Sequence, residues 1–419
     1  MLPGRPGDRA HRGASRRQFL AGAGLAALGG PAFLTACTRD AGGSAGSPAA
    51  TESLQLASPS SPVTWPISPG NEPIADGLAP EANATLQVYN YADYVEPAVI
   101  AAFETQYKCK VNITTFNDMD EALTKVRQGT VPFDVWMGTG YDLISRLVTG
   151  SLIRPLNHSY IPNIANVWPS FTNPWYDQKW QYTVPFTVYT SGLGWRTDLM
   201  ETDPFALRVP WDTLWDPRYK GVTAVWDDSR STIEMCLLKA GVTDVNTGRQ
   251  ADLDKAREQL TQLTRTTQPA VTITMYEDFP AGKFAQCSIW SGDIVSAAAA
   301  ADDPSVFRYW YGEDSGMLDN DLLVLTRTGA NPVLGHLFLN HMLDPGVAMQ
   351  NFSFMGYQPP QISVNPDTMV EEGLIPENLA SVVVREGDFR FGSPALELSQ
   401  EVQAAWRDIW LAFKAGKRP

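Results

Sequence analysis

Residues 85–116, TLQVYNYADYVEPAVIAAFETQYKCKVNITTF, predict a strand, a helix and a second strand in direct succession. The runs TLQVYNY (85–91) and CKVNITTF (109–116) are rich in the β-branched and aromatic residues that favour strands. Pro97 begins an amphipathic run that extends to about Tyr107, and proline is tolerated in the first turn of a helix. This succession predicts a parallel sheet that helices cover on both faces, which is the α/β class.

The alternation of strands and helices continues along the chain. A second α/β block is expected to begin near Trp195, and a later strand is expected to return to the first block. The further strands are expected at 132–138, 221–228, 287–293 and 321–329, and the further helices at 119–128, 142–150, 231–240, 253–263, after Pro332 and at 397–414. Two lobes joined by more than one crossing strand predict a ligand cleft, with its residues at the carboxyl ends of the strands.

The N-terminus has the pattern of an export signal. Arg16 and Arg17 precede a short apolar stretch rich in glycine and alanine, which ends at Cys37 and is too short for a membrane span. It resembles a twin-arginine signal that ends in a bacterial lipoprotein box. This resemblance implies that residues 1–37 form the signal and that Cys37 carries a lipid on its thiol. A plain secretory signal with a chance cysteine is the alternative.

Residues 38–83 are dominated by serine, proline, glycine, alanine and threonine, and they predict a disordered tether. The formal net charge of the chain is −14, and it becomes −18 without residues 1–37, which carry five arginines and one aspartate. A body this acidic is not expected to bind nucleic acid and attracts cations. General solubility explains such a charge equally well.

The chain offers little of the chemistry that an enzyme needs. Beyond the signal there remain Cys109, Cys236 and Cys287, and an odd number permits at most one disulfide with a free thiol left over. His336 and His341 are five residues apart, which suits neither an HExxH motif nor one helix face. No GxSxG motif, P-loop or Cys/His metal spacing occurs in the sequence. No metal and no cofactor are therefore expected.

Six stretches carry a resemblance to a known family: YNYADYVEP, FDVWMGTGYDL, YTVPFTVYTSGLGW, WDTLWDPRYKGVTAVWDDSR, CSIWSGD and DNDLLVL. With them the body from about Thr85 resembles the periplasmic spermidine/putrescine-binding proteins of ABC importers, which have a type II two-lobed fold. WDTLWDPRYKG is common to many binding proteins of this fold, whereas YNYADY and WSGD are more specific to the polyamine branch. The resemblance implies a receptor that captures a cationic polyamine by lobe closure and delivers it to a membrane permease.

The resemblance also implies a set of ligand-binding residues. They are Tyr91, Asp93 and Tyr94 in the first loop, Thr139 and Tyr141 after the third strand, Asp228, Trp290 and Asp293 in the second block, and Asp321 at the crossing strand. Each ammonium group of a polyamine needs a carboxylate. Each methylene run needs an apolar or aromatic face, and an aromatic face beside a cation contributes about 0.5–2 kcal/mol. A loop with the pattern Tyr-x-Asp-Tyr supplies both.

Two positions depart from the family's pattern. Ser231 stands where relatives have a carboxylate, with Glu234 one turn further on, and Asp319 stands where they have an aromatic residue. Because residues two apart in a strand share a face, Asp319 and Asp321 are expected to hold one terminal amine between them. These departures leave the identity of the amine open.

Several of these residues also have a structural interpretation. Asp93 and Asp228 lie just before predicted helices, where acids cap the N-terminus. Trp290 could belong to the core. Asp321 precedes the apolar run LLVL, where a lone buried acid is costly without a cationic partner, so that ligand binding is favoured there.

The sequence therefore predicts a signal (1–37), a tether (38–83), a first lobe (84–192 plus 321–361) and a second lobe (193–320 plus 362–419). The predicted protein is a monomeric lipoprotein at the outer face of the bacterial cytoplasmic membrane. It binds spermidine, putrescine or a similar polyamine for an ABC permease, and it is not an enzyme. The alternatives are a receptor for another small cation, such as a quaternary ammonium, and an exported hydrolase, because paired acids can serve glycoside hydrolysis.

Overall fold

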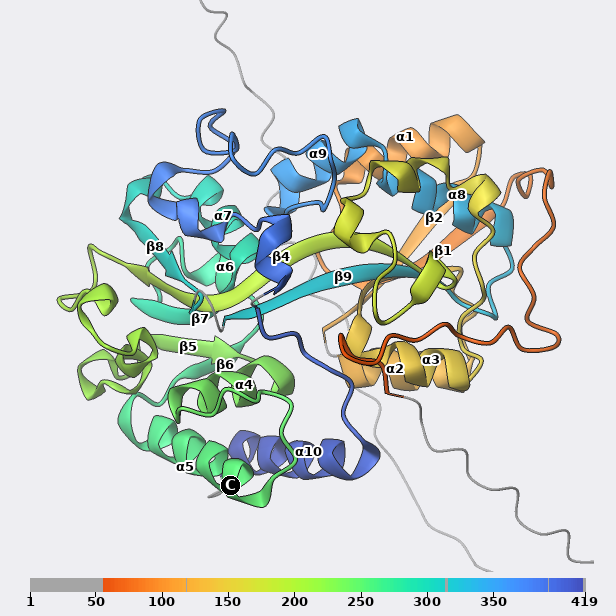
Figure 1. Cartoon of the computed structure of the whole chain (residues 1–419). Helices are drawn as coiled ribbons and strands as arrows, with labels where there is room; N and C mark the ends of the chain where they lie inside the picture. The colour runs from red at the N-terminus through yellow and green to blue at the C-terminus, as the bar shows by residue number, and fades with distance from the viewer. Residues whose placement is uncertain (1–55, 118, 313–315, 391, 417–419) are drawn as a thin grey trace, which may run out of the picture. The chain divides into compact units, whose positions relative to one another are not determined.

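Two long antiparallel strands, β4 (Thr183–Arg196) and β9 (Met317–Leu325), form the centre of the sheet in this computed structural model. The structure describes residues 56–416 except 118, 313–315 and 391, and these residues belong to one compact unit. The nine-stranded sheet has the order β2-β1-β3-β9-β4-β7-β5-β6, and β8 (Phe307–Trp310) pairs with β4. Figure 1 shows β4 and β9 running side by side.

Parallel strands flank this central pair on both sides. The strands on the β9 side are β1 (Thr85–Tyr91), β2 (Lys110–Phe116) and β3 (Val135–Gly140), and those on the β4 side are β5 (Thr223–Trp226), β6 (Ala270–Thr272) and β7 (Gln286–Trp290). β3 joins β9 and β7 joins β4 in antiparallel fashion. The prediction of an α/β fold with two crossing strands is therefore confirmed.

The helices cover both faces of the sheet. They are α1 (Pro97–Tyr107), α2 (Met119–Gln128), α3 (Ile144–Thr149), α4 (Ser229–Lys239), α5 (Gln250–Thr266), α6 (Met275–Asp278), α7 (Ser291–Ala300), α8 (Pro332–Met342), α9 (Pro345–Met355) and α10 (Gln400–Lys414). The bounds of α1 and α2 agree with the sequence predictions. α10 begins at residue 400 rather than 397, because the side chain of Ser399 caps it by accepting from the backbone N–H of Val402.

β1 and β3 bury residues on both of their faces, whereas in β2, at the edge of the sheet, only Phe116 is fully buried. Leu86 and Val88 of β1 pack with α1 and α8, and Tyr89 packs on the opposite face with α2 and α3. Figure 1 shows these two pairs of helices on opposite faces of β1. Buried parallel strands of this kind need apolar residues at consecutive positions. The two layers are named the α1/α8 core and the α2/α3 core below.

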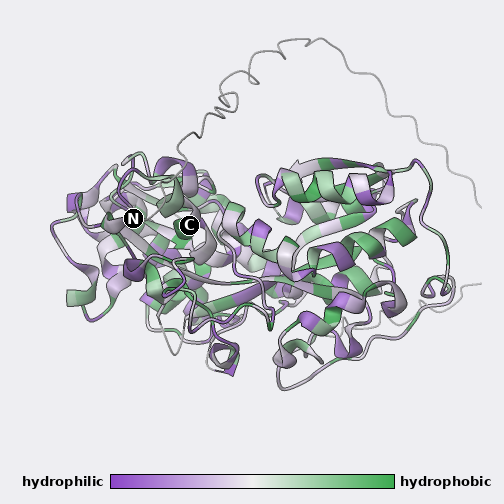
Figure 2. Ribbon diagram, turned by 90° about the horizontal axis from the view of Figure 1, so that it is seen from above, coloured by the Kyte–Doolittle hydropathy of each residue, from purple (hydrophilic) through white to green (hydrophobic). Residues whose placement is uncertain are grey.

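A third core lies among α4, α5, α7 and α10, and it is named the α4–α7 core. β4 links it to the first block, because Val184 and Val188 lie in the α1/α8 core and Leu193 and Trp195 lie in the α4–α7 core. Figure 2 shows apolar and polar residues interleaved along the helices, as expected for helices that bury one face. Two of the predicted lobe boundaries fall within β4 and β9 and the third, at 361/362, falls after α9. The lobe assignment stays a prediction.

The segment 56–83 differs from its predicted role as a tether. Val63 and Trp65 are buried in the α2/α3 core, and the indole N–H of Trp65 donates to the carbonyl of Tyr176 over 2.8 Å. The carboxylate of Glu81 accepts from the backbone N–H groups of Val333 and Leu334. The tether prediction is therefore wrong for this segment, because several of its apolar residues are buried in the α2/α3 core. Residues 1–55, with the predicted signal and Cys37, lie outside the described residues.

Cys109, Cys236 and Cys287 are buried free thiols. Burial raises the pKa of the Cys236 and Cys287 thiols above the ordinary value, which keeps them in the unreactive protonated form. Within the part of the chain that the structure describes, no helix is long and apolar enough to cross a bilayer.

Candidate functional site

Asp321 of β9 is buried among hydroxyl groups that come from two other segments of the chain, the loop after β1 and strand β4. The hydroxyl of Tyr94, in the loop after β1, donates to Oδ2 of Asp321 over 2.6 Å, and the hydroxyl of Tyr189 in β4 donates to Oδ1 over 3.4 Å. Thr187 of β4 lies opposite Asp321 in the sheet, and its Oγ1 is 2.7 Å from the hydroxyl of Tyr94. Burial raises the pKa of Asp321 to about 6, and the hydrogen bond from Tyr94 opposes that rise.

Asp293 is a second buried acid, and it lies in the first turn of α7. Asp293 is only 7% exposed. Its Oδ1 accepts a 3.0 Å hydrogen bond from the hydroxyl of Tyr357. Among the described residues, Oδ2 of Asp293 has no hydrogen-bond partner. Burial raises the pKa of Asp293 to about 7, with the bond from Tyr357 opposing.

Three tyrosine rings connect the two acids. The ring of Tyr357 meets that of Tyr94 at a centroid distance of 5.1 Å and that of Tyr189 at 5.7 Å, both edge to face. Tyr94 and Tyr189 bind Asp321 while Tyr357 binds Asp293. Two carboxylates around a shared aromatic wall form a site suited to cationic groups with an apolar spacer.

Asp319 lies two residues before Asp321, opposite Tyr189 of β4. The hydroxyl of Tyr141 donates to Oδ1 of Asp319, and the backbone N–H of Ala395 donates to the same oxygen over 3.1 Å. The ring of Tyr141 stacks on Tyr176 at 5.3 Å. Burial raises the pKa of Asp319, and the bond from Tyr141 opposes that rise. The two aspartates are coupled, because the charge of Asp319 raises the pKa of Asp321.

The predicted residues of α4 form a helix cap. Asp228 is the N-cap of α4, and its Oδ1 accepts from the backbone N–H of Ser231 over 2.7 Å. The capping interpretation of Asp228 is thus confirmed. Asp228 also lies close enough to Asp319 for its charge to raise the pKa of Asp319.

The loop after β1 divides into a buried and an exposed part. Tyr91 is half-buried, with its ring 6.0 Å from that of Tyr94, and Gly138 leaves room for it, since a Cβ there would lie 2.8 Å from Tyr91 Cδ2. Asp93 is exposed and has a φ of +55°. The cap of α1 is Glu96, whose side chain accepts from the N–H of Ala98, so the capping interpretation of Asp93 is wrong. The structure does not bring Asp93 among the buried acids.

Thr139 and Trp290 occupy intermediate positions. Thr139 of β3 is fully buried, and its Oγ1 lacks a hydrogen-bond partner among the described residues. Trp290 is half-buried at the end of β7, 5.7 Å from the ring of Trp226, and it packs against both the α4–α7 core and the α1/α8 core. Trp290 therefore packs partly in the core, as its structural interpretation predicts. Ligand roles for both residues stay predictions.

The sequence reasoning missed Tyr189, Tyr357 and Arg230. Tyr189 and Thr187 are two residues apart in β4 and therefore share a face, beside Asp321. Prediction of β4 as one strand would have indicated both residues. Tyr357 follows Gly356, which ends α9 with a φ of +78°. Arg230 in the first turn of α4 forms an ion pair with Glu234. Nothing in the sequence around Arg230 indicates that it pairs with a buried acid beside the site.

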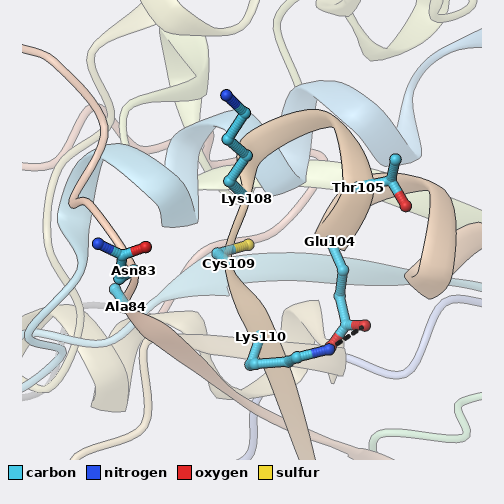
Figure 3. Close-up of a pocket in the computed structure, with 7 residues that line it drawn as sticks. All are labelled: Asn83, Ala84, Glu104, Thr105, Lys108, Cys109 and Lys110. Carbon is cyan, nitrogen blue, oxygen red and sulfur yellow. Dashed lines mark hydrogen bonds and ion pairs between the residues drawn. The ribbon is translucent and has the colours of Figure 1, made fainter.

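A surface pocket lies at the opposite ends of the strands. It has a volume of about 470 Å³. It is lined by Asn83 and Ala84 before β1, and by the end of α1 and the start of β2 with Glu104, Thr105, Lys108, Cys109 and Lys110. Figure 3 shows the ion pair between Lys110 and Glu104, which are 3.4 Å apart, at its rim. Because this pocket borders the amino ends of β1 and β2, it is separate from the tyrosine and aspartate site. The described residues hold no cluster of three or more potential metal ligands.

Crossing strands, parallel sheets on either side and a polar site at the carboxyl ends define a two-lobed type II periplasmic binding protein fold. A family model described as bacterial extracellular solute-binding protein matches residues 98–375, and the chain belongs to this family. The family consists of solute-binding proteins and not of enzymes.

Two relatives and one solved structure show how close the similarity is. The spermidine/putrescine-binding periplasmic protein of Escherichia coli K12 is 24% identical over 311 residues, which are 70% of this chain and 84% of the relative. The putrescine/cadaverine-binding protein of Pseudomonas aeruginosa PAO1 is 21% identical over 356 residues, which are 80% and 96% of the two chains. The structure of an ABC transporter protein from Listeria monocytogenes superposes with a TM-score of 0.70 at 24% identity, over 80% of this chain and 100% of its own.

Proposed function

We propose that the protein is the substrate-binding component of an ABC importer and that it binds a small cationic polyamine of the spermidine or putrescine kind. Asp293 carries this proposal, because its Oδ2 is buried without a hydrogen-bond partner among the described residues. An ionised carboxylate in such a position costs several kcal/mol unless a cation joins it. An ammonium group supplies both the opposite charge and the missing hydrogen bond.

The neighbourhood of Asp293 supports an amine with more than one charge. Asp321 offers a second buried carboxylate, and Tyr94, Tyr189 and Tyr357 offer ring edges and faces for the methylene groups between the charges. Relatives named for spermidine, putrescine and cadaverine point to the same class of ligand. A quaternary ammonium is the second candidate, because an aromatic cage binds it well, but it has no N–H group to donate to Oδ2 of Asp293.

The proposed mechanism is capture by lobe closure. Tyr94 comes from the loop after β1 and Asp293 from the start of α7, and β4 and β9 connect the two halves. A ligand that contacts both halves binds the closed state better than the open one and therefore shifts the population towards it. The closed complex then docks on the permease. X-ray scattering should show a smaller radius of gyration with saturating ligand.

The proposed location is the outer face of the cytoplasmic membrane, where the monomeric protein is held by a lipid on Cys37. The motif that ends at Cys37 supports this placement, and so do the periplasmic relatives. Replacement of Cys37 by serine should release the body into the soluble fraction with unchanged ligand affinity. Retention of the Cys37→Ser variant in membranes would rule out this anchor.

Calorimetry and native mass spectrometry against putrescine, cadaverine, spermidine, spermine and agmatine test the proposed ligand class. We expect at least one of these amines to bind with a mass increase equal to the unmodified ligand. Choline and betaine serve as the quaternary ammonium controls. Binding of choline in preference to every primary amine would refute the polyamine assignment, and chemical conversion of the ligand would refute the receptor role.

A further inference from the structure

The segment Pro394–Glu397, named the C-terminal segment here, is fastened beside the site by four successive residues. The backbone N–H of Ala395 donates to Asp319 over 3.1 Å, and that of Leu396 donates to Oδ1 of Asn246 over 2.7 Å. The amide of Asn246 in turn donates to the carbonyl of Pro394 over 3.0 Å. The segment therefore lies directly against one end of the acid cluster.

Glu397 anchors the same segment to the first block. Its carboxylate is 6% exposed and accepts from the backbone N–H of Ser145 over 3.0 Å and from Nε of Arg146 over 2.9 Å. Both donors belong to α3, whereas α10, which follows the segment, packs in the α4–α7 core. The C-terminal segment is thus held from both halves of the fold.

The acids at this end already have donors from the chain. Asp319 accepts from the Tyr141 hydroxyl and the Ala395 N–H group, and Glu234 is paired with the guanidinium of Arg230. Arg230 also donates to Asn246 and lies over the ring of Trp406 at 4.8 Å. The positive charge of Arg230 therefore already neutralises Glu234 at this end, and a further ammonium group brought here would meet a like charge.

The acids at the other end lack such partners. Oδ2 of Asp293 has no hydrogen-bond partner among the described residues, and the Tyr94 and Tyr189 hydroxyls that donate to Asp321 are neutral. Hydroxyl groups also accept hydrogen bonds, so they can share an ammonium with the carboxylate that they contact. Asp293 and Asp321 are therefore the carboxylates that most need a cation, and the rings of Tyr94, Tyr189 and Tyr357 lie between them.

We propose that the C-terminal segment ends the ligand site at Asp319 and that the site selects a diamine, bound between Asp293 and Asp321, over longer polyamines. Asp319 is then a positioning residue that holds the chain. This inference rests on the proposed function, because it specifies which amines fit. It also replaces the expectation that Asp319 and Asp321 share one terminal amine.

Two variants of Asp319 separate positioning from ligand contact. Asn at this position keeps an acceptor for Ala395 and Tyr141, whereas Ala removes the acceptor and with it the contact between Asp319 and the C-terminal segment. Calorimetry should give at least about tenfold preference for putrescine over spermidine in the native protein. Asp319→Asn should keep that ranking, and Asp319→Ala should reduce the preference at least fivefold. Loss of diamine binding in Asp319→Asn as large as that in Asp293→Asn would overturn the inference.

Hydrogen exchange of the native protein gives a readout that needs no variant. The Ala395 amide should be protected without ligand, and saturating putrescine should not speed its exchange, because the ligand does not compete for Asp319. Faster exchange in the complex would overturn the inference. Tighter binding of spermidine than of every diamine would also overturn it and would leave the proposed function standing. Absence of binding for all the amines would overturn both.

Discussion

The segments that follow β1 and β7 carry similar residues in different structures. Each follows a parallel strand, and each offers an aromatic residue with an acid close behind: Tyr91 with Asp93, and Trp290 with Asp293. Asp93 is exposed with a φ of +55°, whereas Asp293 is 7% exposed and bound to Tyr357. Only the segment after β7 places its acid in the buried site.

The position of the helix start explains this difference. α1 begins at Pro97, four residues after Asp93, so that a turn separates the acid from the helix. α7 begins at Ser291, directly after the last residue of β7, and Asp293 lies in its first turn, where the helix dipole favours a negative charge. The immediate start of α7 therefore fixes Asp293 in the buried site, whereas the turn before α1 leaves Asp93 exposed.

Replacement of Asp293 by asparagine should have the largest effect. The variant keeps the acceptor for Tyr357 but removes the charge opposite an ammonium, and loss of such a partner costs about 2–5 kcal/mol of binding, or roughly thirtyfold or more in affinity. The variant should unfold at the same or a higher temperature at pH 8, because a buried charge is gone. Calorimetry and thermal unfolding measure both quantities. An affinity within threefold of the native value would contradict the comparison.

The second effect is a pH dependence of binding. Burial raises the pKa of Asp293 to about 7 and that of Asp321 to about 6. An ammonium binds the ionised forms, so affinity should rise between pH 5.5 and 8, by at most about tenfold per pH unit for each titrating acid. Proton release should accompany binding, and calorimetry in two buffers with different ionisation enthalpies measures it.

The stability of the free protein should change in the opposite direction. Each acid has a folded pKa above its unfolded value of about 4, so the stability that it provides is present below pH 4 and is lost as the pH rises through 6 and 7. The ligand should therefore raise the melting temperature more at pH 8 than at pH 5.5. An equal shift at both values would show that these acids do not meet the ligand.

Gly292 provides a third and smaller test. A Cβ at this position would lie 2.2 Å from Cδ2 of Tyr357, so Gly292→Ala must displace the ring that binds Asp293. We expect a loss of about 1 kcal/mol or more in the free energy of unfolding, together with weaker amine binding. Gly387→Ala is the matched control, because an added Cβ there meets no atom within 4 Å. Equal unfolding curves for the two variants would refute the close packing of Tyr357 on α7.

Asp93→Asn should have the smallest effect. Asparagine tolerates the left-handed backbone of this position, and substitutions at exposed sites usually change stability by less than about 0.5 kcal/mol. Affinity for the best amine should stay within twofold of the native value. A loss comparable to that of Asp293→Asn would show that the first loop turns inward when the ligand binds.

Local patterns in the sequence were sufficient for elements with clear ends. α1 starts at Pro97 because proline fits the first helical turn, and α2 stops before Gly129, whose φ of +62° suits the left-handed region. The β-branched and aromatic runs of β1 and β2 had no competing helical pattern. The acids Asp293, Asp319 and Asp321 were located through the family resemblance, and the structure places all three in or beside one polar site.

Contacts between distant segments could not be read in the same way. Tyr189 reaches Asp321 only because β4 pairs with β9, and Tyr357 reaches Asp293 only because α9 ends beside α7. The start of α7 has no side-chain cap that would have marked it. Trp65 lies in a stretch with the composition of a linker, and its burial depends on distant partners such as Tyr176, 111 positions away.

The pairing of β3 with β9 has a consequence for folding during synthesis on the ribosome. Val135 lies opposite Leu325, so a ribosome that adds about 5–20 residues per second needs roughly ten to forty seconds to supply the missing partner. Until then the outer edge of β3 exposes unpaired N–H and C=O groups, which are a template for aggregation. The nascent chain therefore depends on a chaperone or on rapid completion of synthesis, and premature termination before Met317 should yield an insoluble product.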